Sequence, residues 1–262
     1  MKTNNYYIRR LNNQYIFFAS LLLVSVSDST SALMFDFLTQ PLTIEPTSIS
    51  ITTAGVTATA AAYHVEFENG TSTIYGPFTT GYVGARQVFG TETRGASNPG
   101  LGLVTAQQLG QRETDIPSGG LQPGLDNFPS TSTNYLPSIQ FVLFSFNSPV
   151  DISQVIVDDT SNFDRDSWVA GGISAPNFSL DLVQAFDHFN VINSKDNESD
   201  GIFIHTFNSL IGIKFLAVGT ALPSTVGDVG LFAQGFPTGA SHFYINALNF
   251  EKSNIIFSDD FE

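Results

Sequence analysis

Alternation of apolar and polar residues with a period of two constrains the fold of this chain more than any other feature. Residues 42–53 (LTIEPTSISITT) and 56–67 (VTATAAAYHVEF) both alternate in this way, and Ala54 and Gly55 separate them. Successive side chains of a β-strand point to opposite faces of its sheet, so the pattern predicts half-buried strands. The two-residue connection predicts that these strands form a hairpin.

Similar runs continue toward the C-terminus, and they are residues 140–146, 150–157, 178–186, 201–207, 211–218, 229–233 and 243–250. Between the first two of them, Asn147-Ser148-Pro149 predicts a tight turn. Charged residues make up 13% of the chain, about half of the roughly 25% in ordinary globular domains, which leaves little material for amphipathic helices. The pattern therefore predicts an all-β fold, an antiparallel β-sandwich of jelly-roll-like type.

One long segment interrupts this pattern. Residues 84–137 are rich in Gly, Ser, Asn, Thr and Pro and carry only short apolar islands. Long loops of this kind inside a compact domain are typically functional or mobile. The strands that follow need partner strands, so we expect one β-sandwich domain over residues 33–254 that includes this loop region.

The N-terminus has the character of an export signal. Lys2, Arg9 and Arg10 form a positive region, residues 15–26 (YIFFASLLLVSV) form an apolar run, and small residues follow at 30–32. This order predicts a signal peptide over residues 1–32. Twelve apolar residues are too few to cross a bilayer core, which needs about 20. We therefore expect a secreted or surface protein with no membrane span in its mature chain.

Charge and composition exclude several classes of function. The formal net charge is −14, and removal of residues 1–32, which contain three basic residues and one acidic residue, makes it −16. An acidic surface of this kind disfavours nucleic acid and anionic lipid as partners. The absence of Cys removes disulfides, thiolate nucleophiles and Cys-ligated metals.

The densest group of possible ligands follows a predicted strand. Asp158, Asp164 and Asp166 lie within one short acidic segment, next to the single Trp, and Asp126 in the long loop region is a candidate fourth carboxylate. Calcium takes six to eight hard oxygen ligands, which a flexible acidic loop can supply. These four residues are the predicted calcium ligands. The alternative is a solvated acidic turn, because the spacing is not that of an EF-hand. A second acidic loop at 195–201 fits a hairpin turn or a weaker calcium site.

No catalytic motif accompanies this segment. The four histidines, His64, His188, His205 and His242, stand alone without the spacing of a zinc site. The nucleophile elbow GxSxG and the phosphate-binding motifs GxGxxG and GxxxxGK[ST] are absent. A non-enzymatic protein is therefore favoured. A secreted carbohydrate-active enzyme stays open as the alternative, because a catalytic carboxylate pair can come from any two strands.

A series of short motifs connects the chain with a known group. They are Gly100-Leu101-Gly102-Leu103, Asp126-Asn127, residues 141–151 (FVLFSFNSPVD), Asp164-Arg165-Asp166-Ser167-Trp168, and Phe215-Leu216-Ala217-Val218-Gly219 followed by residues 243–250. In this order they resemble motifs of secreted bacterial β-sandwich proteins of the PEP-CTERM-associated type. The sorting tail of that group is missing here, so covalent anchoring by that route is not expected. Instead, residues 255–262 (IIFSDDFE) form an acidic C-terminal tail.

The resemblance implies a jelly-roll-like protein of the cell surface or extracellular matrix. Combined with the acidic segment, it predicts an exported, non-enzymatic protein that binds calcium, polysaccharide or both. The expected partners are extracellular polysaccharide or other surface proteins, and calcium is the only expected cofactor.

The export signal can be tested by mass spectrometry. Expression of the whole chain in a bacterial host should yield a protein outside the cytoplasm that lacks about the first 32 residues, because signal peptidase cleaves after small residues. An uncleaved product that stays in the cytoplasm would contradict the prediction.

Overall fold

The computed structural model describes residues 32–37, 43–44, 48–77, 86–89, 102–104, 125–128, 137–158, 167–194, 202–222, 232 and 242–254. All of them belong to the compact unit Ala32–Glu262. The predicted signal peptide, the acidic loop at 195–201 and the C-terminal tail lie outside the described residues, apart from Ala32. Only short pieces of the predicted long loop region are described.

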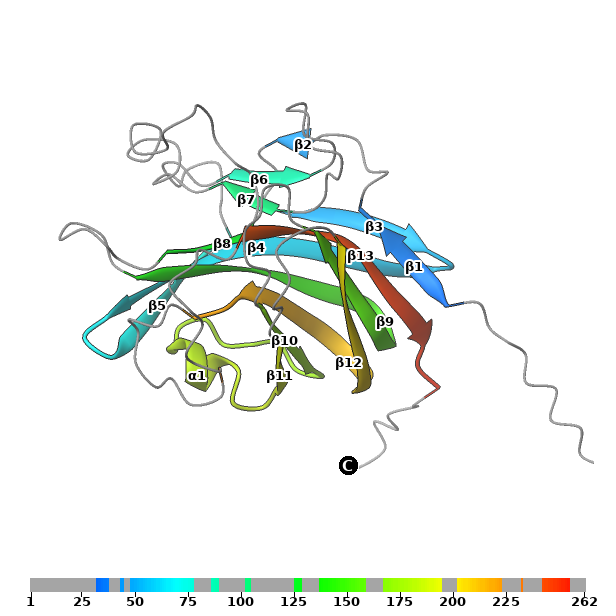
Figure 1. Cartoon of the computed structure of the whole chain (residues 1–262). Helices are drawn as coiled ribbons and strands as arrows, with labels where there is room; N and C mark the ends of the chain where they lie inside the picture. The colour runs from blue at the N-terminus through cyan, green and yellow to red at the C-terminus, as the bar shows by residue number, and fades with distance from the viewer. Residues whose placement is uncertain are drawn as a thin grey trace, which may run out of the picture. The chain divides into compact units, whose positions relative to one another are not determined.

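The described part is almost entirely antiparallel β-structure (Figure 1), which confirms the predicted all-β, sandwich-like fold. In chain order the elements are β1 (Leu33–Asp36), β2 (Thr43–Ile44), β3 (Ile49–Thr53), β4 (Val56–Glu68), β5 (Thr71–Tyr75), β6 (Arg86–Phe89), β7 (Gly102–Val104), β8 (Leu125–Phe128), β9 (Ser138–Asp158), β10 (Ser167–Gly172), α1 (Leu182–Ala185), β11 (Asn190–Ser194), β12 (Ile202–Thr220) and β13 (His242–Lys252).

Ten of the strands form one sheet. Its main path runs β1-β13-β8-β9-β12-β10-β11, β4 pairs with β9, and β3 and β5 flank β4. A separate small sheet contains β2, β6 and β7. The long strand β9 is central, because it pairs with β4, β8, β12 and β13.

The large sheet bends, and β9 and β12 continue through the bend. Residues 138–146 of β9 pair with β4 and with residues 215–219 of β12. Residues 150–158 of β9 pair with the first part of β12 and with β13. The sheet thus has two halves that share these two strands. The first half contains β4 and residues 138–146 of β9, and the second half contains β13 and residues 150–158 of β9. The register between β9 and β12 shifts where the first half passes into the second.

The predicted turn at Asn147-Ser148-Pro149 is therefore wrong, because these residues lie within β9. The backbone N–H of Thr57 donates to the Asn147 side-chain oxygen at 2.8 Å, so a side chain replaces a backbone acceptor at this point. Pro149 brings no N–H that would need a ladder partner. The pattern marked a real irregularity, but the chain bends there instead of reversing.

A first hydrophobic core fills the space between the two halves. Phe35 of β1 stacks on Phe250 of β13, with ring centroids 4.2 Å apart, and also on Phe146 in the other half of the sheet. The buried members of this core come from both halves: Phe35, Phe37, Val56, Ala58, Ala60, Ala62, Val142, Phe144, Phe146, Val150, Ile152, Val155, Val157, Val169, Phe207, Leu210, Ile213, Leu216, Val218, Phe243, Ile245, Leu248 and Phe250.

A second core lies on the opposite face of the first half, where α1 and the segment around it cover the sheet (Figure 1). Seven of its fifteen buried members are aromatic, and the members are Tyr63, Val65, Phe67, Ile139, Phe141, Leu143, Trp168, Ala170, Leu182, Ala185, Phe186, Phe189, Ala217, Leu222 and Phe232. Burial in this core raises the pKa of Tyr63 to about 12.

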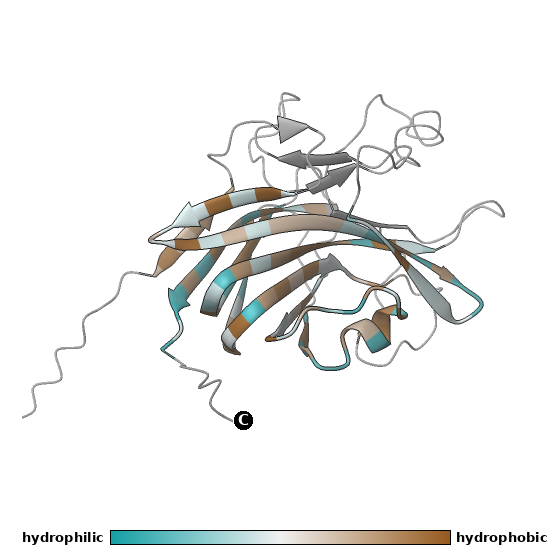
Figure 2. Ribbon diagram, turned by 180° about the vertical axis from the view of Figure 1, so that it is seen from behind, coloured by the Kyte–Doolittle hydropathy of each residue, from teal (hydrophilic) through white to brown (hydrophobic). Residues whose placement is uncertain are grey.

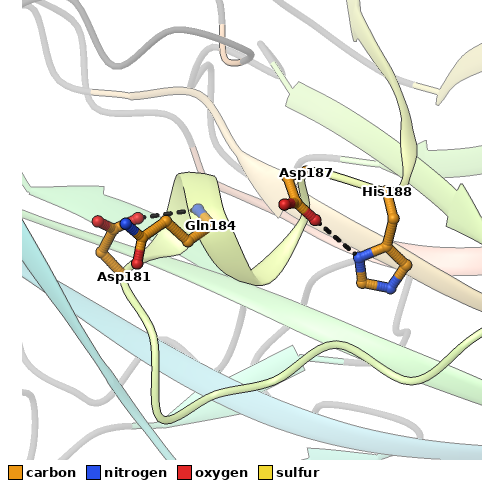
Figure 3. Close-up of polar contacts among 4 residues, drawn as sticks. All are labelled: Asp181, Gln184, Asp187 and His188. Atoms are coloured by element: carbon orange, nitrogen blue, oxygen red, sulfur yellow. Dashed lines mark hydrogen bonds and ion pairs between the residues drawn. The ribbon is translucent and has the colours of Figure 1, made fainter.

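The predicted strand at residues 178–186 is also wrong, because this segment forms a turn followed by α1. Asp181 caps the helix, and its carboxylate accepts a hydrogen bond from the backbone N–H of Gln184 at 2.9 Å (Figure 3). Leu182 and Ala185, three residues apart, both face the second core. A single helical turn carries too short a pattern to be told from a strand.

The predicted hairpin between residues 42–53 and 56–67 is confirmed for β3 and β4. Ala54 and Gly55 have φ of 51° and 79°, the positive values that a two-residue type I′ turn requires at both central positions. Figure 2 shows the alternation along the strands as bands of apolar and polar colour. In the described part of the chain, no helix has the length and apolarity needed to cross a membrane.

A glycine beside the single Trp gives a test of the second core. Gly219 of β12 lies opposite Trp168 of β10, and a Cβ at this position would overlap the indole ring. We expect Gly219→Ala to destabilise the fold by about 3 kcal/mol, the upper end for overpacking. Thermal unfolding should report a lower Tm. Gly219→Ala should cost much less when combined with Trp168→Phe, and equal costs in both backgrounds would contradict this packing.

Candidate functional site

Asp158 is the predicted calcium ligand whose side chain the structure describes. It is the last residue of β9 and is 0% exposed. Val155 and Val157 belong to the first core, so the alternation of the strand points Asp158 to the opposite face. Asp164 and Asp166 lie outside the described residues, in the segment between the end of β9 and the start of β10.

The register of β13 relates Asp158 to Asp126. Tyr244 of β13 lies opposite Asp158, and His242 lies opposite Asp126 of β8. The two acidic residues therefore face positions of β13 that are separated by one residue. Two of the four predicted ligands are carried to the same end of this strand, although they are 32 positions apart in the sequence.

A buried amide lies beside Asp158. The register between β13 and β9 shifts between Ile245 and Ala247, and Asn246 is the extra residue of this bulge. Its side-chain Nδ2 donates to Asp158 Oδ2 at 3.4 Å, and its Oδ1 has no hydrogen-bond partner. Asn246 is only 2% exposed, and an unpaired buried acceptor is costly, about 1–3 kcal/mol.

Asn246 is not among the site residues predicted from the sequence. The signal that marks it is an amide inside the apolar, alternating run at residues 243–250 (FYINALNF). The period of two does not reveal a bulge, and only the register with β9 brings this amide to Asp158.

Among the described residues, no three His, Asp or Glu side chains gather as metal ligands. Of the four predicted calcium ligands, only Asp158 has a described side chain, so this result does not test Asp126, Asp164 or Asp166. The described site thus consists of one buried carboxylate and one buried amide, at the point where the acidic segment begins.

A second group of polar residues lies inside the sandwich, at one end of the first core. Ser167 Oγ of β10 and His205 Nε2 of β12 are in hydrogen-bond contact at 2.9 Å. Next to Ser167 in the ladder is Thr220, whose hydroxyl accepts from the backbone N–H of Gln140 at 3.3 Å. All four are buried. A serine–histidine contact is the geometry of a nucleophile and its base, but here both partners are buried, and the contact connects β10 to the first part of β12.

His64 of β4 has an acidic neighbour on the same face of its strand. Its Nε2 lies 3.4 Å from Glu66 Oε1. The hydrogen bond from His64 lowers the pKa of the Glu66 carboxyl most, and the charge of His64 and a hydrogen bond from Tyr75 lower it further, against an opposing effect of burial. The pair holds an ionised carboxylate at the edge of the core.

His188 differs from the buried histidines. It follows α1 on an exposed turn, and its Nδ1 lies 3.0 Å from Asp187 Oδ1 (Figure 3). The Asp187 side chain is 70% exposed, and a surface pair of this kind contributes little to stability. The sequence predicted that each histidine stands alone, but His64, His188 and His205 each have a polar partner.

Trp168 lies beside the acidic segment in the sequence, but its side chain is in the second core. Its ring contacts Phe141, Phe186 and Phe232, and it is 1% exposed. The single Trp therefore serves the packing of β10.

Comparison with known proteins gives no family for this chain. No protein-family model matches it, and no curated protein matches it significantly.

The pair of His64 and Glu66 predicts a pH dependence of stability. Because the pKa of Glu66 is lowered in the folded state, its carboxylate stabilises the fold above the ordinary value near pH 4.5, and this contribution is lost as the pH falls below that value. Glu66→Gln should lower Tm above about pH 5 and have little effect near pH 3. Melting curves across this range, with the exposed Glu68→Gln as control, test the expectation. An equal Tm difference at both ends would contradict it.

Proposed function

We propose that the protein is an exported, non-enzymatic β-sandwich protein of the cell surface or extracellular matrix that binds calcium where β9 passes into the acidic segment. The observation that carries this proposal is the fully buried carboxylate of Asp158 at the last position of β9. Burial of a carboxylate costs less free energy when polar groups and a cation lie beside it. A divalent cation compensates the charge and accepts several oxygen ligands at once.

The residues around Asp158 support calcium as this cation. Calcium is bound by carboxylates, amide and backbone carbonyl oxygens and water in flexible geometry. The segment that follows Asp158 contains three more aspartates, Asp159, Asp164 and Asp166. Magnesium fits less well, because it demands near-ideal octahedral geometry and keeps several waters.

The partner that we propose is an acidic polysaccharide or an acidic surface protein, held through calcium. At −14 the protein repels other anionic polymers. A calcium ion shared between its acidic segment and an anionic partner removes this repulsion locally. Attachment through calcium would then depend on the cation and be reversed by a chelator.

The packing of apolar side chains against both faces of the sheet favours a binding protein over the carbohydrate-active enzyme. A glycosidase needs two carboxyl groups that face a groove, about 5 Å apart or about 6.5–9.5 Å apart according to mechanism. In the described part of the first half of the sheet, apolar side chains of the two cores occupy both faces. The Asp158 carboxylate of the proposed calcium site lies at the end of β9.

Thermal unfolding with calcium and with a chelator tests the proposal. Calcium at 100 times its Kd should stabilise the fold by about 2.7 kcal/mol, which raises Tm by about 5–10 °C in a domain of this size. Asp158→Asn and the double variant Asp164→Asn/Asp166→Asn should lose most of this shift. Asp187→Asn, which removes an exposed carboxylate elsewhere, should keep it. An unchanged Tm of the natural protein in calcium and in chelator would overturn the proposal.

A further inference from the structure

We infer that His64 and Glu66 of β4 and Ser138 of β9 form a binding site for a primary ammonium group. We call these three residues the polar cluster. Ser138 is the first residue of β9, so the cluster lies at the end of the first half of the sheet that is farthest from the bend. It shares no residue with the calcium site, and the inference therefore goes beyond the proposed function.

The pairing of β4 with β9 places the three side chains on one face. Ser138 lies opposite Glu66, and His64 precedes Glu66 by two residues on the same strand. Ala62 of β4 and Val142 of β9 belong to the first core. The residues of the polar cluster alternate in step with these two, so they point to the same side of the sheet. Opposite and diagonal neighbours of an antiparallel pair are close enough for their side chains to bind one small group.

Two polar atoms of the cluster are buried without a partner. Ser138 is 1% exposed and His64 is 6% exposed. In the part of the chain that the structure describes, neither Ser138 Oγ nor His64 Nδ1 has a hydrogen-bond partner. Buried polar atoms of side chains nearly always have one. Two such atoms on one face, beside a carboxylate, indicate that a bound polar group completes the cluster.

The hydrogen bonding of His64 decides what this group must offer. Its Nε2 lies 3.4 Å from Glu66 Oε1 and donates a hydrogen bond to this carboxylate. In the neutral imidazole the other nitrogen, Nδ1, is then an acceptor. The Glu66 carboxylate only accepts, and the Ser138 hydroxyl can accept as well as donate. The polar cluster therefore offers three acceptors, and its ligand must bring donors.

A primary ammonium group matches this set of acceptors. It has three N–H donors and no acceptor, whereas a hydroxyl group brings one donor and no charge. Its positive charge also complements Glu66, because the hydrogen bond from His64 lowers the pKa of this carboxyl most and keeps it ionised. Hydrogen bonds between an ammonium and a carboxylate are about twice as strong as neutral ones. The formal net charge of −14 attracts cations to the protein.

Glu66 is the member of the cluster that solvent reaches. Its side chain is 23% exposed, whereas the side chain of His64 is 7% exposed. Tyr75 of β5 lies opposite His64 and also donates a hydrogen bond to the Glu66 carboxylate, so the carboxylate is held in place from two strands. An ammonium group can approach past Glu66 while the rest of its molecule stays outside. A simple amine and an amino sugar both carry this group.

Calorimetric titration of the natural protein tests the inference, at neutral pH and in a chelator so that calcium plays no part. The probes are propylamine, glucosamine and glucose. We expect both amines to bind, and glucose, which has the sugar ring without the ammonium, not to bind. Tighter binding of glucosamine than of propylamine would assign the site to amino sugars, and equal affinities would assign it to simple amines. Absence of binding by both amines overturns the inference, and so does equal binding of glucose and glucosamine.

Ser138→Ala separates a binding role from a structural one. The variant removes a hydroxyl that has no partner in the empty protein, so its Tm should be unchanged or slightly higher. Its affinity for the amines should nevertheless fall about tenfold, the usual effect of a lost hydrogen bond to a charged group. Ser145→Ala, the same substitution further along β9, should keep the affinity within about twofold. A lower Tm of Ser138→Ala with unchanged affinity would contradict the inference.

Glu66→Gln tests the charge of the site. It keeps the shape of the side chain and should abolish amine binding, because the ammonium loses its counter-charge. Glu68→Gln removes an exposed carboxylate from the same strand and should keep the affinity. Equal losses in both variants would assign the binding to the general acidity of the protein and overturn the inference. Should Glu66→Gln not fold, the affinity and Tm of Ser138→Ala decide the question.

The two proposals fail separately. If calcium and chelator leave Tm unchanged while the amines bind, the proposed function is overturned and the ammonium site stands. If calcium raises Tm while neither amine binds, only the ammonium site is overturned.

Discussion

The continuity of β9 and β12 through the bend of the sheet is the constraint on which the structure depends. Each strand presents apolar side chains to the first core on both sides of the bend, as Phe144 and Phe146 of β9 do before it and Val150 and Ile152 do after it. The register between the two strands shifts as they pass through the bend. Because both strands belong to both halves, the halves cannot slide past each other without breaking two long ladders, and the first core stays closed.

This constraint explains how far the sequence could predict the fold. Alternation identified β4 and most of β12 and β13, because one face of each strand is apolar. It missed β10, whose six residues are all buried. Val169 faces the first core while Trp168 and Ala170 face the second, and a strand that is buried on both faces has no period of two. The bend in β9 was interpreted as a turn because proline and asparagine mark both.

The site was predictable to the extent that its residues are local. Asp158 could be identified because a run of acidic residues follows an apolar strand. Asn246 lies 88 positions away in the chain and reaches Asp158 only through the pairing of β13 with β9. The contact of Ser167 with His205 depends in the same way on how β10 and β12 meet. Contacts of this kind follow from register, and register is decided by the whole sheet.

Asn246 and Asp158 bring together, at the end of β9, three features that each cost stability. A bulge gives up regular ladder pairing, a buried carboxylate needs compensation, and a buried amide oxygen needs a donor or a cation. Here all three fall on two contacting residues, next to the most acidic segment of the chain. They meet at the end of β9, where the proposed function places its ion.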